Sequence, residues 1–96
     1  MRVVNLRKEP YDIYIGRGSI FGNPYRISKY RTRQIVIDWY REWFYSQLKD
    51  PFFKAEVEKL RGVEILGCYC KPLACHGDII VEYLENTSHQ EKKGGK

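Results

Sequence analysis

Apolar residues follow two different spacings along this chain, and the change of spacing separates strands from helices. Residues 2–6 are a short β-branched run and residues 11–15 alternate apolar with polar side chains, so both segments predict strands. The continuous run at residues 63–70 is short and apolar, which predicts a third strand at the centre of a sheet.

The other segments show the three- and four-residue spacing of helices. Residues 32–48 show it best, with Thr32 placed as the N-cap, and residues 50–62 begin with the Asp-Pro pair of a helix start. Residues 75–85 predict a last helix after a turn. The apolar residues that recur along the longest helix are Ile35, Val36, Trp39, Tyr40, Trp43, Phe44 and Leu48.

The predicted order is β-β-α-α-β-α, which indicates a small single α/β domain with a short central sheet flanked by helices. A chain of 96 residues is too short for two cores. We expect the third strand to lie beside the first or the second. Residues 1–86 form the predicted domain, and the polar residues 87–96 predict a disordered tail.

Charge narrows the choice of partner. The chain has 17 basic and 12 acidic residues and a formal net charge of +5, which favours a phosphate-bearing ligand or nucleic acid. No apolar run reaches the about 18 residues of a membrane-spanning helix, and the first residues do not form a signal peptide. We therefore expect a soluble cytoplasmic protein with no membrane partner.

All three cysteines lie within eight residues of one another, next to a histidine. Cys68, Cys70, Cys75 and His76 are the ligand types that zinc prefers, so zinc is the cofactor that these residues suggest. The spacing is unusual for a structural zinc site, because the ligands straddle a strand end, a turn and a helix start.

Two other interpretations of the cluster stay open. Cys75 lies where the first turn of the last helix is predicted, which favours its thiolate, with His76 as a base and Asp78 as its orienting group. These three are the predicted catalytic residues. The thiols can instead be core side chains, Cys68 most of all, or Cys70 and Cys75 can form a disulfide.

A glycine-rich segment follows the second strand. Residues 16–19 read Gly-Arg-Gly-Ser, which offers backbone N–H groups, a guanidinium and a hydroxyl to an oxyanion. The segment matches neither the Walker pattern nor the dinucleotide-binding pattern. The residues predicted to bind the ligand are Asn5, Arg7, Gly16, Arg17, Gly18, Ser19 and Asn23.

Basic and aromatic residues alternate after this loop. Such a mixture in an exposed groove suits nucleic acid, because aromatic rings stack on bases and cations bind phosphates. The aromatic residues concerned are Tyr14, Phe21, Tyr25, Tyr30 and Tyr69. The basic residues predicted to contact nucleic acid are Arg26, Lys29, Arg31 and Arg33.

Three motifs together resemble domain-of-unknown-function family 4326, a family of small phage, archaeal-virus and prokaryotic proteins. The motifs are Y-I-G-R-G-S at residues 14–19, G-N-P at residues 22–24 and C-x-C-x-P-x-x-C-H-G-D at residues 68–78. The likeness extends over about residues 3–84. It implies that the glycine loop and the Cys-His-Gly-Asp segment face one another across a single pocket, but it brings no activity with it.

Two functions are consistent with these features. The first is a pocket for a nucleotide or another phosphorylated small molecule between the glycine loop and the Cys-His-Gly-Asp helix start, with enzymatic activity left open. The alternative is a zinc-stapled nucleic-acid-binding module of a virus or mobile element. The residues predict neither a reaction nor an oligomeric state.

Overall fold

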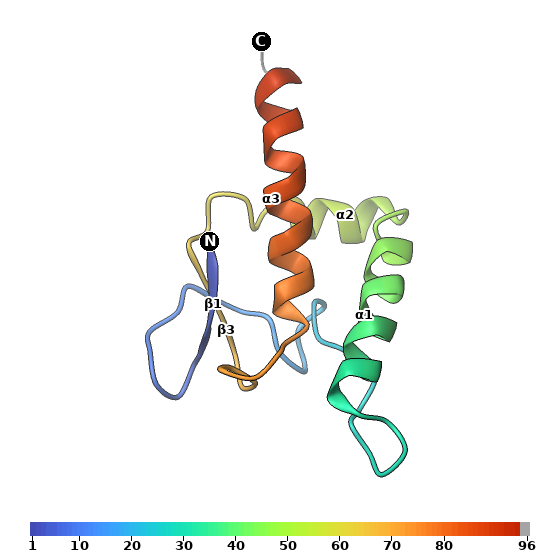
Figure 1. The fold of residues 1–96 in the computed structure, drawn as a ribbon. Helices are drawn as coiled ribbons and strands as arrows, with labels where there is room; N and C mark the ends of the chain where they lie inside the picture. Colours follow the sequence, from blue (N-terminus) through green and yellow to red (C-terminus); the bar gives the residue numbers. More distant parts are fainter. Residues whose placement is uncertain (95–96) are drawn as a thin grey trace.

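The three strands form one parallel sheet, with the last strand in the middle. The computed structural model describes residues 1–94, and the side chains of residues 1–87 (Figure 1). Strands β1 (Arg2–Asn5), β2 (Ile13–Tyr14) and β3 (Ile65–Cys68) lie in the order β1-β3-β2, and β3 is parallel to both neighbours. The carboxyl ends of all three strands therefore lie at the same edge of the sheet.

The predicted fold class and the central position of the third strand are confirmed. The strands are shorter than the apolar runs that predicted them. Pairing nevertheless continues past the ends of β2, because the N–H of Asp12 donates to Ile65 O over 2.8 Å and the N–H of Ile15 donates to Gly67 O over 3.0 Å. The short sheet thus extends as far as the start of the glycine loop.

Helices α1 (Arg33–Gln47) and α2 (Pro51–Glu58) form the crossover between β2 and β3. Both begin as predicted: the Thr32 hydroxyl accepts from the N–H of Ile35, and the Asp50 carboxylate accepts from the N–H of Phe52. Each cap satisfies a backbone donor that the first helical turn leaves without a partner.

Helix α3 (Gly77–Gly94) follows β3 and packs along β1 (Figure 1). Its backbone stays helical through residues 87–94, most of the segment for which composition predicts disorder, while residues 95–96 lie outside the described residues. Glu, Gln and Lys are good helix formers, so a polar segment without proline can continue a helix that is already nucleated. In Figure 1 this part of α3 extends beyond the sheet.

The core lies between the sheet and the inner faces of the helices. Tyr40, Phe44, Val57, Leu66 and Ile80 are fully buried. Two residues that share the helical spacing are partly outside this core: Trp39 is 40% exposed and Ile35 is 37% exposed. No helix within residues 1–94 is both long enough and apolar enough to cross a membrane.

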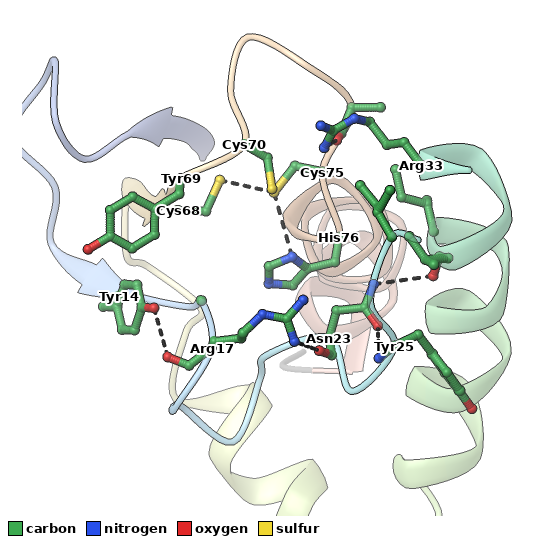
Figure 2. Close-up of a pocket in the computed structure, with 15 residues that line it drawn as sticks. Tyr14, Arg17, Asn23, Tyr25, Arg33, Cys68, Tyr69, Cys70, Cys75 and His76 are labelled. Atoms are coloured by element: carbon green, nitrogen blue, oxygen red, sulfur yellow. Dashed lines mark hydrogen bonds between the residues drawn. The ribbon is translucent and has the colours of Figure 1, made fainter. Parts of the chain in front are cut away.

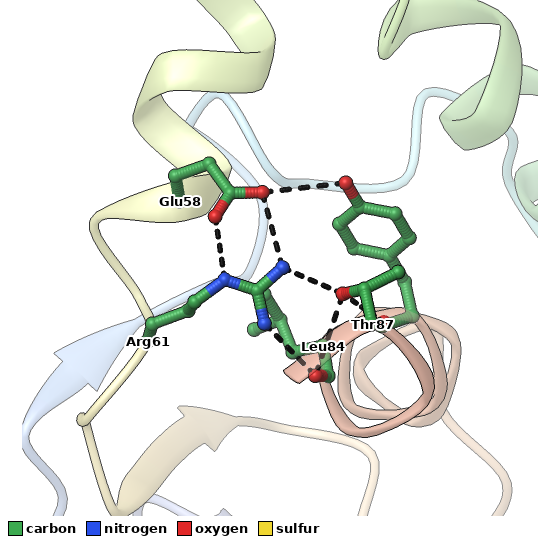
Figure 3. A network of polar contacts seen from close by, with 5 residues as sticks. Glu58, Arg61, Leu84 and Thr87 are labelled. Atoms are coloured by element: carbon green, nitrogen blue, oxygen red, sulfur yellow. Dashed lines mark hydrogen bonds and ion pairs between the residues drawn. The ribbon is translucent and has the colours of Figure 1, made fainter. Parts of the chain in front are cut away.

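A polar network ties the end of α2 to α3 (Figure 3). The Arg61 guanidinium donates to the Glu58 carboxylate, to Leu84 O over 3.0 Å and to the Thr87 hydroxyl over 2.6 Å. The Tyr83 hydroxyl donates to the same carboxylate over 3.3 Å. Hydrogen bonds from Arg61, the largest effect, lower the pKa of Glu58, so the carboxylate stays charged in this network.

Candidate functional site

A pocket opens at the edge of the sheet where the parallel strands end. It has a volume of about 280 Å³ and is lined from three directions: by the segment after β2, by the segment after β3 and by the first turns of α1 (Figure 2). This is the arrangement that the resemblance implied for the two motif segments. The lining residues are Tyr14, Gly16, Arg17, Asn23, Tyr25, Ile27, Arg33, Val36, Ile37, Cys68, Tyr69, Cys70, Ala74, Cys75 and His76.

The glycine loop is held in shape by its own polar groups. The Ser19 hydroxyl and the Ser19 N–H both donate to Gly16 O, and the Tyr14 hydroxyl donates to Arg17 O over 2.7 Å. A Cβ at Gly22 would lie 2.7 Å from Gly16 O, so this close approach of backbone requires glycine. Gly16 and Arg17 are therefore presented to the pocket by a rigid turn.

The other residues predicted to bind a ligand have structural partners. Among the described residues, Gly18 and Ser19 do not line the pocket. Asn23 does, but its amide donates to Val36 O over 3.2 Å and its side-chain oxygen accepts from the N–H of Tyr25 over 2.8 Å. The amide nitrogen of Asn23 thus anchors the loop to α1, and its side-chain oxygen closes a turn within the loop.

Asn5 and Arg7 lie outside the pocket lining of the described residues. The amide of Asn5 donates to Lys71 O over 2.8 Å, which ties the end of β1 to the segment after β3. The Arg7 guanidinium lies 5.1 Å from the centre of the Tyr69 ring. These two residues thus contact the segment after β3, which forms one side of the pocket. Strands β1 and β2 are both parallel to β3, which lies between them.

The three thiols converge despite their unusual spacing. Cys68 ends β3, Cys70 follows two residues later and Cys75 precedes α3, yet their sulfur atoms all lie within 4.8 Å of one another. The Cys68 and Cys75 sulfurs are 3.0 Å apart. All three cysteines are free, so the structure has no Cys70–Cys75 disulfide, which was one of the open interpretations of the cluster. The cluster could hold a metal ion.

Contacts within the cluster shift the pKa values of Cys70 and Cys75 in opposite directions. Hydrogen bonds from Cys68 and Cys75, together with the Arg33 guanidinium, lower the pKa of Cys70. The same thiol contacts and burial raise the pKa of Cys75, although the N–H of Gly77 donates to its sulfur over 3.3 Å. These opposite pKa shifts favour the thiolate on Cys70 over Cys75, the residue that the helix position had favoured.

His76 is buried between the cluster and the core. Its Nε2 donates to Ile15 O over 2.7 Å, and its Nδ1 lies 3.7 Å from the Cys75 sulfur (Figure 2). Burial lowers the pKa of His76, so the ring is neutral at pH 7. Because a carbonyl can only accept, the proton is on Nε2, and the Nδ1 lone pair is directed to the cysteines.

The Asp78 carboxylate has other partners than the His76 ring that it was expected to orient. The carboxylate pairs with the Lys71 ammonium over 2.7 Å and accepts from the N–H of Cys75 over 3.2 Å. Among the described residues Asp78 does not line the pocket. It closes the turn between Cys70 and α3. Of the three predicted catalytic residues, Cys75 and His76 therefore reach the pocket and Asp78 does not.

The predicted basic patch is divided between two places. Arg33 begins α1, lines the pocket and donates to Ala74 O over 3.4 Å. Arg26, Lys29 and Arg31 are exposed on the loop that precedes α1. The Arg31 guanidinium lies 5.1 Å from the Trp39 ring centre, so this partly exposed ring has a cationic partner.

Several lining residues were missed by the sequence analysis. Ile27 and the helix residues Val36 and Ile37 form apolar walls that no motif indicated. Arg33 was assigned to a nucleic-acid patch. Its position at the N-terminus of α1, three residues before Val36, is the only signal that could have placed it at the strand-end edge. Tyr14 and Tyr69 meet edge to face, with ring centres 6.2 Å apart.

Comparisons with known proteins identify a family and a phage relative. The sequence model of a family described as Domain of unknown function (DUF4326) matches residues 2–86. A protein of Enterobacteria phage T4, described as an uncharacterized 12.4 kDa protein in the nrdA-td intergenic region, is 42% identical over 84 residues, which cover 86% of this chain and 76% of the phage protein. No solved structure matches the chain.

Proposed function

Because this chain belongs to the family described as Domain of unknown function (DUF4326), whose description carries no activity, we propose a function from the pocket alone. The proposed function is the binding of a nucleotide or another small phosphorylated molecule at the carboxyl edge of the sheet. The observation that carries it is a single pocket lined by two arginines, Arg17 and Arg33, and by the rings of Tyr14, Tyr25 and Tyr69.

Arg17 and Arg33 supply the positive charge for a phosphate. They enter from different walls, the glycine loop and the start of α1. The Arg17 guanidinium donates to Asn23 O over 3.1 Å and the Arg33 guanidinium to Ala74 O over 3.4 Å. Since a guanidinium has five N–H donors, each retains donors for a phosphate after these bonds.

The apolar part of the pocket suits a flat ring. Tyrosine rings offer faces and edges to a base, and Ile27, Val36 and Ile37 add carbon surface. A volume of about 280 Å³ lies just below the range of ordinary ligand pockets, which is roughly 300–1,000 Å³. This favours a mononucleotide or a sugar phosphate over a dinucleotide.

Thermal unfolding with a ligand panel tests this proposal. The panel contains nucleoside monophosphates, the corresponding nucleosides and inorganic phosphate. A ligand at about 100 times its Kd stabilises by about 2.7 kcal/mol, which raises the Tm of a domain of this size by roughly 10 °C or more. We expect a phosphorylated member of the panel to stabilise the wild type more than its nucleoside does.

Arginine variants locate the binding site. Arg17→Ala and Arg33→Ala should each abolish most of the shift, whereas Arg26→Ala removes the same charge from the exposed loop and should retain it. No shift with any ligand, or equal shifts for Arg17→Ala and the wild type, would contradict the proposal.

A second candidate function is a zinc-stapled nucleic-acid-binding module, and one observation favours it. Arg26, Lys29 and Arg31 are exposed on one loop with Tyr30, whose side chain is 82% exposed, and the Lys29 ammonium lies 5.6 Å from the Tyr30 ring centre. An exposed ring among cations can stack on an unpaired base.

Fluorescence anisotropy with single-stranded DNA and RNA tests the second candidate. Binding should weaken steeply with salt, because each bound phosphate releases counterions. The triple variant Arg26→Ala, Lys29→Ala and Arg31→Ala should lose binding. A control variant with Lys8→Ala, Lys49→Ala and Lys54→Ala loses the same charge from other exposed sites and should retain it. Equal affinities of the two variants would exclude the loop.

A further inference from the structure

We infer that Cys68, Cys70, Cys75 and Nδ1 of His76 form a tetrahedral Zn²⁺ site in the wall of the pocket. The inference stands apart from the identity of any ligand in the pocket.

The sulfur positions agree with one metal ion. Zn–S bonds of about 2.3 Å in a tetrahedron place sulfur atoms roughly 3.8 Å apart. The three sulfurs here lie within 4.8 Å of one another, and the closest pair, Cys68 and Cys75, is 3.0 Å apart. The needed adjustments are about an ångström or less, which side-chain rotation can provide.

His76 supplies a nitrogen beside the triad. In the same tetrahedron a sulfur and a nitrogen ligand are about 3.6 Å apart, and Nδ1 of His76 lies 3.7 Å from the Cys75 sulfur. Its Nε2–H is bonded to Ile15 O over 2.7 Å. Metal-binding histidines usually donate their second N–H to a carbonyl or carboxylate, which fixes the ring and its tautomer, and His76 has this arrangement.

The turn that brings the ligands together is well supported. The N–H of Leu73 donates to Cys70 O over 2.9 Å, and the amide of Asn5 donates to Lys71 O over 2.8 Å. The Asp78 carboxylate accepts from the N–H of Cys75 on the other side. These bonds hold Cys70 and Cys75 across the turn without any metal, so the chain supplies a preformed site.

Neighbouring groups match the charge of a zinc site. Three thiolates with one Zn²⁺ and a neutral imidazole carry a net charge of −1, and binding releases the thiol protons to solvent. Arg33 and Arg17 line the same pocket, and the N–H of Gly77, in the first turn of α3, donates to the Cys75 sulfur over 3.3 Å. The guanidinium groups and the helix N-terminus offset the negative charge.

Metal content and thiol titration of the purified chain provide the first test. We expect stoichiometric zinc, released as a mercurial reagent titrates the three thiols, and reloading of the metal-free chain with Zn²⁺ or Co²⁺. Bound cobalt should give a thiolate charge-transfer band and the visible bands of tetrahedral coordination. A folded chain that takes up neither metal and whose thiols titrate freely would overturn the inference. This readout uses the wild type and needs no variant to fold.

Variants then assign the ligands. Cys70→Ser changes the least buried of the three thiols and should weaken cobalt binding by more than the roughly 10–100-fold that loss of a supporting contact costs. His76→Gln can still donate to Ile15 O but lacks a ligand atom at the Nδ1 position, so it should shift the visible cobalt bands and weaken binding. Unchanged bands in His76→Gln would remove His76 from the site.

Tyr69→Phe is a matched control. Tyr69 lies between Cys68 and Cys70 in the sequence and lines the pocket, but its side chain has no sulfur or imidazole nitrogen to bind the metal. Its cobalt spectrum should equal that of the wild type. If Tyr69→Phe weakened cobalt binding as much as Cys70→Ser does, the assignment of Cys70 as a ligand would be overturned. Since ligand-induced thermal shifts are measured separately, a failed metal test leaves the proposed pocket function intact, and the reverse also holds.

Discussion

His76 donates through Nε2 to the carbonyl of Ile15 over 2.7 Å, and this one bond joins two segments that are 61 residues apart in the sequence. Ile15 is the residue that pairs β2 with β3 just before the glycine loop, and His76 directly precedes α3. The bond therefore holds the two motif segments together at the edge of the sheet. It also directs the free nitrogen of the imidazole to the cysteines.

Loss of this bond should destabilise the domain even without metal. His76→Leu leaves the Ile15 carbonyl without its donor and should lower the free energy of unfolding by about 1–3 kcal/mol. His76→Gln retains an N–H group near the Nε2 position and should lose less. Urea unfolding in the presence of a chelator measures both. Equal stabilities of the wild type and His76→Leu would show that the bond contributes nothing.

Another buried hydrogen bond joins α1 to the loop that follows β2. The Tyr40 hydroxyl donates to Phe21 O over 2.7 Å inside the core, and burial raises its pKa, so it stays protonated as a donor. Tyr40→Phe should cost about 1–3 kcal/mol in unfolding free energy, because the carbonyl remains buried and unpaired. Tyr30→Phe, on an 82% exposed ring, is the control and should be neutral within about 0.5 kcal/mol. Similar losses in both variants would contradict this account.

Acid should weaken the link between α2 and α3. Hydrogen bonds from Arg61 lower the pKa of Glu58 in the folded state below its unfolded value of about 4.3. The stabilisation is therefore complete above that unfolded value and is lost as the pH falls through the folded-state pKa. Glu58→Gln should lower stability at pH 7 by up to about 1 kcal/mol, since the pair is partly exposed, and the difference should vanish in acid.

Glu56→Gln is the matched control for this prediction. It removes one carboxylate from the same helix, where Glu56 pairs with the Lys59 ammonium, 70% exposed at its side chain. Its effect at pH 7 should be smaller than that of Glu58→Gln. A difference between Glu58→Gln and the wild type that persisted unchanged in acid would show that packing, rather than the charge on Glu58, is responsible.

The close approach inside the glycine loop gives a prediction for Gly22. In Gly22→Ala the new Cβ would lie 2.7 Å from Gly16 O and 3.1 Å from the Arg17 Cα, and backbone atoms cannot move aside cheaply. We expect this variant to lose stability by about 1–3 kcal/mol and to lose ligand-induced thermal shifts. Ile20→Ala, at a 44% exposed position of the same loop, should retain those shifts. Wild-type behaviour of Gly22→Ala would contradict the geometry of the loop.

Much of the fold could be predicted from local sequence patterns, because helix caps and apolar runs depend on residues that are close together in the chain. Thr32 and Asp50 cap their helices as expected, and the apolar run of β3 does become the central strand. The spacing of apolar residues alone could not show which residues of α1 are buried and which lie at the margin of the core. Trp39 shares the helical period with Tyr40, yet Trp39 contacts the exposed Arg31 while Tyr40 is fully buried.

The candidate site was only partly readable, because it depends on contacts between distant segments. The family resemblance implied that the glycine loop and the Cys-His-Gly-Asp segment line one pocket. Sequence could not show that Asp78 pairs with Lys71 rather than with His76, nor that the strand-end turn brings all three sulfurs together. Spacing along the chain argued against the convergence of Cys68 and Cys75, whereas the fold places their sulfurs 3.0 Å apart.

The central claim is that one pocket between the two motif segments takes a phosphorylated ligand. Titration of the isotopically labelled chain with a nucleoside monophosphate, followed by NMR, tests it most directly. The account predicts that the amide resonances of Gly16, Arg17, Cys70 and His76 shift together with a single Kd, while those of Lys29 and Tyr30 do not. Shifts confined to Lys29 and Tyr30, or no shifts at saturating concentrations, would contradict it.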